Sequence, residues 1–209
     1  STLLDVVRKY ADIMMHTMER YFVLEDTMEI TDKIAQDVMK NVMKYAKILK
    51  KDPENYEARA EIMWCGSLSH NGLTGCGTCG GDWATHLIEH ELGGMFDVAH
   101  GAGLAAVWGS WARYVMDEKP ERFAQFAVDV MGVEESDDVK STALKGIEAV
   151  EEFYRMIEMP TNMKELGIDP TDEQIKDMAM KATNHDTQQL GAFKKLSAKD
   201  LVEIYKTAK

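Results

Sequence analysis

Residues 101–116 read GAGLAAVWGSWARYVM, and this stretch decides the fold. Apolar side chains and glycines occupy nearly every position, so a helix made from it is apolar on almost all sides instead of along one stripe. The run is shorter than the roughly 18 to 20 apolar residues that a membrane helix needs. We therefore predict that it forms the central helix of a bundle, and we expect no membrane partner.

On both sides of this stretch, apolar residues recur at intervals of three and four, the period of a helix. Runs typical of strands are missing. No internal repeat or low-complexity linker interrupts the chain, so we predict an all-α helical bundle in one domain, residues 1–209. The expected helices span residues 3–21, 32–49, 53–70, 83–92, 101–116, from 120 onward, 137–156, 171–183 and 197–207.

Capping residues refine several of these helix ends. Asp52 followed by Pro53 is typical of an N-cap and first helical position, and Asp82 is placed to cap the helix at 83–92. The pair Gly93-Gly94 should end that helix. Ser197 and Asp200 form a variant of the capping box.

Charge and cysteine content narrow the function classes. The 24 basic residues are outnumbered by 36 acidic ones, the net charge is -12, and no basic stripe stands out. A nucleic-acid partner is therefore not expected. Three cysteines, an odd number, argue against a secreted disulfide framework and favour a reducing compartment, so we expect a cytoplasmic protein.

Histidines cluster just before the central helix. In DWATHLIEHEL, residues 82–92, His86 and His90 share one helical face, and His100 follows after a glycine pair that lets the chain turn. A single histidine of this kind more often makes a hydrogen bond in the core. A cluster of three within so short a segment favours a metal site.

A second pair of potential ligands lies near the N-terminus. Asp12 and His16 are four residues apart in a helical segment, about 40° apart around the axis, and so share a face. Alone, such a pair is equally typical of a surface hydrogen bond. Together with the histidine cluster it favours a divalent metal, and by spacing alone His86 and His90 are equally good ligands.

The motifs around these residues resemble a known family. Residues 82–92 and 96–105 are similar to the signature of the iron-containing alcohol dehydrogenases, closest to the butanol dehydrogenase and aldehyde reductase branch. Residues 12–16 resemble the other metal motif of that family, and residues 196–208 resemble its C-terminal helix. The resemblance implies the family's C-terminal metal-binding domain, with a dehydroquinate synthase-like fold.

Carried over by position, the resemblance implies a set of roles. It implies that the metal ligands are Asp12, His16, His86 and His100. His90 is then not a ligand but lies near nicotinamide and substrate, with a catalytic or cofactor-binding role. The family name suggests Fe²⁺, although one carboxylate and three imidazoles also suit Zn²⁺, Co²⁺ or Ni²⁺.

The resemblance also implies partners that the chain lacks. The family's enzymes have an N-terminal α/β domain that binds NAD or NADP, and nothing here resembles it. Because Ser1 also takes the place of an initiator methionine, we expect a C-terminal domain separated from that partner. The expected function is that of an NAD(P)-dependent alcohol dehydrogenase acting on a small alcohol or aldehyde. The sequence does not decide whether the protein forms a homo-oligomer.

Other interpretations of the sequence compete with this one. The isolated chain can be a helical metal-binding module without activity. The doublet His185-Asp186 is also found in helical metal-dependent phosphohydrolases, although a polar turn explains it as well. The stretch GCGTCG at 75–80 matches both a Cys-x-x-Cys pair and a dinucleotide fingerprint, but it follows a predicted helix instead of a strand.

Overall fold

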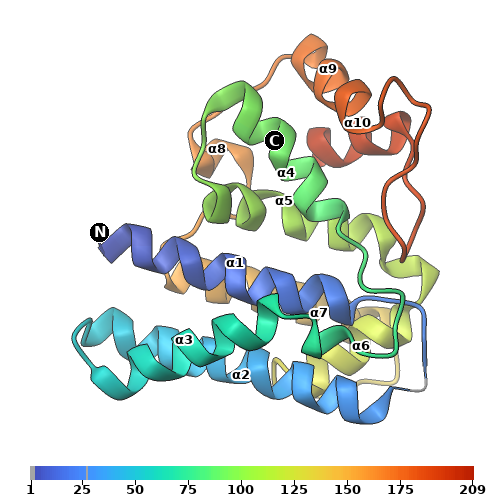
Figure 1. The fold of residues 1–209 in the computed structure, drawn as a ribbon. Coiled ribbons are helices and arrows are strands. Elements are labelled where there is room, and N and C mark those ends of the chain that lie inside the picture. The colour runs from blue at the N-terminus through green and yellow to red at the C-terminus, as the bar shows by residue number, and fades with distance from the viewer. Residues whose placement is uncertain (1–2, 27) are drawn as a thin grey trace.

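The computed structural model describes residues 3–26 and 28–209 as a bundle of helices (Figure 1). The helices are α1 (Leu3–Tyr21), α2 (Glu29–Lys51), α3 (Tyr56–His70), α4 (Ala84–Phe96), α5 (His100–Val115), α6 (Pro120–Asp129), α7 (Val139–Met156), α8 (Met163–Leu166), α9 (Asp172–Ala182) and α10 (Ala198–Thr207). Two short 3-10 helices are η1 (Leu73–Gly75) and η2 (Met116–Glu118). These described residues contain no strand, only an isolated bridge between Leu190 and Leu196. The all-α prediction is confirmed.

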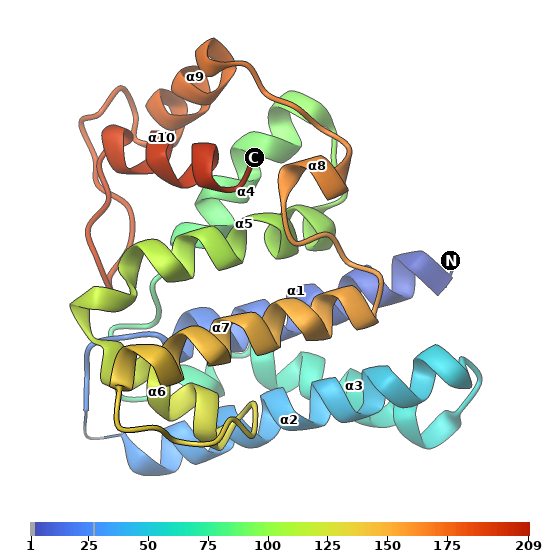
Figure 2. The ribbon, with the colours of Figure 1, turned by 180° about the vertical axis from the view of Figure 1, so that it is seen from behind.

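Helix α5 lies at the centre of the bundle, as its sequence predicts. It contacts α1, α4, α7, α8 and α10, and Trp108 and Trp111 on it are fully buried. In both views a layer containing α1, α2, α3, α6 and α7 lies on one side of α5, while α4, α8, α9 and α10 lie on the other (Figures 1 and 2). The described part of the chain has no helix both long and apolar enough to cross a bilayer.

A close contact between α1 and α5 depends on one glycine. A Cβ atom added at Gly101 would lie 2.1 Å from the backbone oxygen of Arg8. Only a residue without a side chain allows this approach. It brings the start of α5, and with it His100, against the middle of α1.

A buried ion pair joins helices of the layer that contains α1, α2, α3, α6 and α7. The guanidinium of Arg122 on α6 donates to both carboxylate oxygens of Asp32 on α2, at 2.6 and 2.7 Å. The same group donates to the backbone oxygen of Tyr21 at 2.9 Å and lies 3.8 Å from the centre of its ring. Helices α1, α2 and α6 are therefore fixed to one another.

Several predicted helix ends differ in the structure. Helix α3 is capped by Asn55, whose side chain accepts from the Ala58 amide at 3.0 Å, so the prediction of a start at Asp52-Pro53 is wrong. Helix α4 continues through Gly93-Gly94 and ends at Asp97, which adopts a left-handed conformation with φ 53°. The glycines are tolerated because α4 packs against α5 and α9 along its length.

Other predicted features hold. Asp82 accepts from the Ala84 amide at 3.0 Å, although the capping position itself is one residue later. The Ser197 and Asp200 capping box is present at the start of α10. On α3, the large apolar side chains of Tyr56 and Met63 are 85% and 74% exposed.

Candidate metal centre

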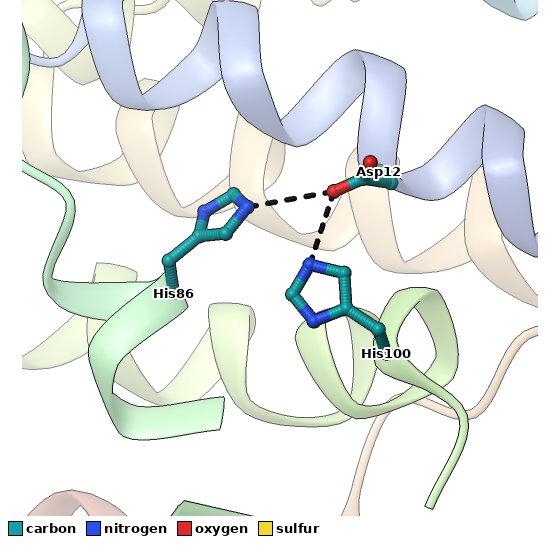
Figure 3. A group of neighbouring side chains, drawn as sticks. All are labelled: Asp12, His86 and His100. Carbon is teal, nitrogen blue, oxygen red and sulfur yellow. Dashed lines mark ion pairs between the residues drawn. The ribbon is translucent and has the colours of Figure 1, made fainter. Parts of the chain in front are cut away.

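Three helices bring an aspartate and two histidines together (Figure 3). Asp12 comes from α1, His86 from the first turn of α4 and His100 from the first residue of α5. The Nε2 atoms of His86 and His100 lie 3.4 and 3.2 Å from the same oxygen, Oδ1 of Asp12. One potential ligand atom from each residue lies within 4.8 Å of the others.

Two atoms at this point are buried without a hydrogen-bond partner. They are Oδ1 of Asp12 and Nε2 of His86. Burying polar atoms without a partner is unfavourable, and native proteins rarely leave them so. Since these atoms face each other, a cation between them would satisfy both.

Buried carboxylates hold the other nitrogen of each ring. Nδ1 of His86 is hydrogen-bonded to Glu19, which is 1% exposed, and Nδ1 of His100 lies 2.5 Å from Glu89, which is 2% exposed. A carboxylate accepts, so each Nδ1 donates and each neutral ring presents the Nε2 lone pair to the centre. Metal-binding histidines usually have such a partner.

The sequence reasoning missed both of these glutamates. Glu89 lies within the histidine motif itself, and Glu19 lies three residues after His16. The only signal available was that an acidic residue stood in a segment predicted to be helical. Both glutamates are buried and reach the histidine rings only because α1, α4 and α5 pack together, and no local pattern in the sequence indicates this packing.

His16 lies beside this group. Its Nδ1 donates to the backbone oxygen of Asp12 at 2.9 Å and is 3.3 Å from Oδ1 of that residue. The centre of its ring is 4.6 Å from that of His86. The structure thus places His16 next to Asp12 and His86, and its role as a metal ligand stays a prediction.

His90 stands at the edge of the cluster. It is exposed, and the centre of its ring is 6.2 Å from that of His86 and 5.7 Å from that of His100. It also forms a potential ligand group with Glu89 and His100. Its predicted role beside the metal stays a prediction.

His70, the last residue of α3, is a further histidine that the sequence reasoning did not select. The centre of its ring lies 3.9 Å from that of His16, and its Nε2 is 3.5 Å from Oδ2 of Asp12. Asp12, His16 and His70 form a second potential ligand group. Nothing in the local sequence pairs His70 with Asp12, because the two meet only when α3 packs on α1.

The carboxylates change the acidity of the histidines. Burial lowers the pKa of His86, but the opposing effects of Asp12 and Glu19 are larger together and raise it to about 9. Asp12 and Glu89 raise the pKa of His100 to about 10, against the effect of burial. Burial raises the pKa of Asp12, but the neighbouring rings of His100, His16 and His86 outweigh that effect and hold the pKa well below its usual range. The acidic groups of the cluster therefore favour the protonated form of both rings.

The competing motifs lie elsewhere. Cys76 and Cys79 are exposed free thiols in a loop that follows α3, so no strand precedes them as a dinucleotide fingerprint requires. His185 and Asp186 lie in a turn with left-handed backbone, and Asp186 accepts from the Ala198 amide at 2.9 Å. Within residues 3–26 and 28–209, none of these four residues enters a group of three potential metal ligands.

Several known proteins are similar to this chain in sequence. Residues 7–209 match the model of the Fe-containing alcohol dehydrogenase family, C-terminal part. The NADH-dependent butanol dehydrogenase A of Clostridium acetobutylicum is 32% identical over 197 residues, which cover 94% of this chain and 50% of that protein. The NADPH-dependent aldehyde reductase YqhD of Escherichia coli is 30% identical over 205 residues, 98% of this chain and 52% of that protein.

Solved structures agree with these matches. The substrate- and cofactor-free aldehyde reductase YqhD of E. coli superimposes with a TM-score of 0.93 at 28% identity, covering 100% of this chain and 54% of that one. The NADH-dependent butanol dehydrogenase A of Thermotoga maritima gives a TM-score of 0.90 at 32% identity, covering 99% and 52%. The chain spans about half the length of the curated relatives it matches.

Proposed function

The chain belongs to the Fe-containing alcohol dehydrogenase family, whose C-terminal part it matches, and on this basis we propose that it is the metal-binding half of an NAD(P)-dependent alcohol dehydrogenase or aldehyde reductase. The relatives whose names carry these activities are about twice as long. We propose that the nicotinamide cofactor is bound by a nucleotide-binding domain that these 209 residues do not include.

The observation that carries the proposal is the pair of buried, unpartnered atoms, Oδ1 of Asp12 and Nε2 of His86, that face one another. With Nε2 of His100 they provide one oxygen and two nitrogens, a donor set that suits Fe²⁺, Zn²⁺, Co²⁺ and Ni²⁺. The residues present therefore fit a divalent cation. We propose that His16 is the fourth ligand, as the family resemblance implies.

When bound, a divalent cation would act as a Lewis acid toward the oxygen of an alcohol or aldehyde during hydride transfer with the nicotinamide. The chain's own residues prepare the site. Glu19 and Glu89 accept hydrogen bonds from the Nδ1–H groups of His86 and His100 and so keep both Nε2 atoms directed at the centre. The carboxylate of Asp12 supplies a negative charge that offsets part of the positive charge of the cation.

We propose that His90 faces substrate and nicotinamide. Its exposed ring lies next to those of His86 and His100 without sharing their contact with Asp12. An imidazole at that edge can hold or transfer a proton at the substrate oxygen. The metal ligands, in contrast, are directed inward by buried partners.

Metal binding by the chain itself tests the proposal. After removal of metals with a chelator, the chain should bind one Fe²⁺, Zn²⁺ or Co²⁺ tightly, and Asp12→Ala or His100→Ala should abolish tight binding. The variant His185→Asn, at an exposed turn, is the matched control. Full metal content in both site variants would refute the proposed centre.

The enzyme activity needs a separate assay. The longer protein that contains these residues should oxidise NADH or NADPH with a short-chain aldehyde, and only when metal is supplied. Absence of turnover with the metal in place would contradict the proposed reaction while leaving the metal centre intact.

A further inference from the structure

The carboxylate of Asp12 presents its two oxygens to different histidines. Oδ1 faces Nε2 of His86 and of His100, at 3.4 and 3.2 Å. Oδ2 faces Nε2 of His70, at 3.5 Å. The proposed centre uses only the first side of this carboxylate, and the second side has no role in it.

His16 and His70 are held in the same way as the proposed ligands. Nδ1 of His70 donates to the backbone oxygen of Gly66 at 2.8 Å, and Nδ1 of His16 donates to that of Asp12 at 2.9 Å. A carbonyl oxygen can only accept, so in each neutral ring the lone pair is on Nε2. A backbone carbonyl on the second ring nitrogen is one of the usual partners of a metal-binding histidine.

We propose that Asp12, His16 and His70 form a second divalent-cation position, which shares the Asp12 carboxylate with the first. One potential ligand atom of each residue lies within 4.8 Å of the others, as in the group of Asp12, His86 and His100. Each group contains two imidazoles and one carboxylate, which suits Fe²⁺, Co²⁺ and Zn²⁺. A bridging carboxylate is compatible with the spacing of roughly 3.5–4 Å typical of two-metal sites.

Asp12 and His16 are the residues that the two positions have in common. With one cation bound, His16 completes the first position; with two, it pairs with His70, whose ring lies against its own. The inference rests on the proposed function through Asp12 and His16, which both proposals use. Its own support is the placement of His70, which the proposed function does not use.

The second position is open to arriving ligands. The side chain of His70 is 44% exposed, whereas that of His86 is 10% exposed. Asp12 and His70 also line a groove between α1 and α3, together with the apolar side chains of Ile13 and Ile62. A cation at this position would therefore lie in a groove that also contains the basic side chains of Lys9 and Arg59.

Titration of the metal-free chain with Co²⁺ tests the inference. Calorimetry should find two binding events per chain, the second weaker, and His70→Ala should remove only the second. The Co²⁺ electron paramagnetic resonance signal should weaken as the second ion binds, because a shared carboxylate couples the two ions. His70→Asn repeats the test with a polar side chain, and His185→Asn is the control for weak binding to exposed histidine.

The outcomes separate this inference from the proposed function. One Co²⁺ per wild-type chain, lost in His100→Ala, would leave the proposed centre standing and refute the second position. Two Co²⁺ retained in both His70 variants would also refute it, as would loss of both ions with the helical circular dichroism unchanged. No bound Co²⁺ at all would contradict both proposals.

Discussion

Asp12 is the residue on which the whole site depends, because three histidines approach its Oδ1 and a fourth approaches its Oδ2. The Asp12 carboxylate faces the Nε2 atoms of His86 and His100, whereas Glu19 and Glu89 contact the Nδ1 atoms of these rings from the opposite side. This division separates the atoms available to a cation from the atoms that orient the rings. It also permits the two kinds of residue to be tested independently.

Glu19→Gln should weaken metal binding without removing a ligand. The glutamine side chain keeps the volume but loses the charge that orients and polarises the His86 ring through Nδ1. Loss of such a partner typically lowers metal affinity about 10- to 100-fold. Competition with a chromogenic chelator measures the change.

Glu91→Gln is the control for that experiment, because Glu91 follows His90 on α4, whereas the carboxylate that hydrogen-bonds to His86 is that of Glu19. Its metal affinity should match that of the wild type. Equal affinities in Glu19→Gln and the wild type would show that Glu19 has no part in holding the ring.

The stability of the metal-free chain should fall as the pH rises. The pKa of folded His86 is raised to about 9 by Asp12 and Glu19 against the effect of burial, while an unperturbed histidine titrates near 6.5. The protonated ring therefore contributes stability that is fully present below about pH 6.5 and is lost as the pH rises through about 9. Urea unfolding at pH 6 and pH 9 should show the decrease.

Added metal should reverse that dependence. The cation displaces protons from the ring nitrogens, so its affinity increases with pH over the same interval. Asp12→Asn, which removes the charge facing His86, should flatten the pH dependence of the metal-free chain. An Asp12→Asn profile as steep as that of the wild type would refute this explanation.

At the level of the helices, the contact of α5 with α1 determines whether His100 reaches Asp12. Gly101→Ala would place a methyl carbon 2.1 Å from the Arg8 backbone oxygen, which cannot move without shifting α1. Overpacking of this kind typically costs about 1–3 kcal/mol. We expect lower stability in urea unfolding together with weaker metal binding, because His100 precedes the displaced residue.

Gly146→Ala provides the matched comparison. A Cβ there would lie 2.5 Å from that of Ala127, where α7 crosses α6, away from the histidines. We expect a comparable loss of stability, with the metal affinity of the folded chain unchanged. Equal loss of metal affinity in both variants would mean that binding follows general stability and not the position of α5.

The helices could be predicted well where local signals are strong. The apolar run of α5 and the capping box of α10 gave helices close to the observed ones. The start of α3 was wrong because Asn55 competes successfully with Asp52 for the cap. The end of α4 was wrong because tertiary packing outweighs the low helix propensity of Gly93-Gly94.

For the molecule as a whole, the metal site was harder to predict than the fold. Short motifs made Asp12, His16, His86, His90 and His100 candidates, and only the family resemblance implied which four of them are ligands. The structure brings Asp12, His16, His86 and His100 together. Glu19 and His70 belong to no motif that includes their partners. Their contacts form only between helices, so a pattern in one segment cannot reveal them.

The proposed ligands lie on α1 and on the consecutive helices α4 and α5, which are far from α1 in the sequence, so a bound cation should stabilise the bundle by joining α1 to this pair. Because the unfolded chain does not hold these residues together, binding adds about 2.7 kcal/mol at a free cation concentration 100 times the Kd. For a chain of this size that corresponds to a rise in Tm of roughly 5–10 °C. Differential scanning calorimetry with and without Zn²⁺ measures it, and excess chelator should reverse it. His100→Ala should show no rise, whereas His185→Asn should show the full one. An unchanged Tm in the wild type at that concentration would mean that the cation does not link the three helices.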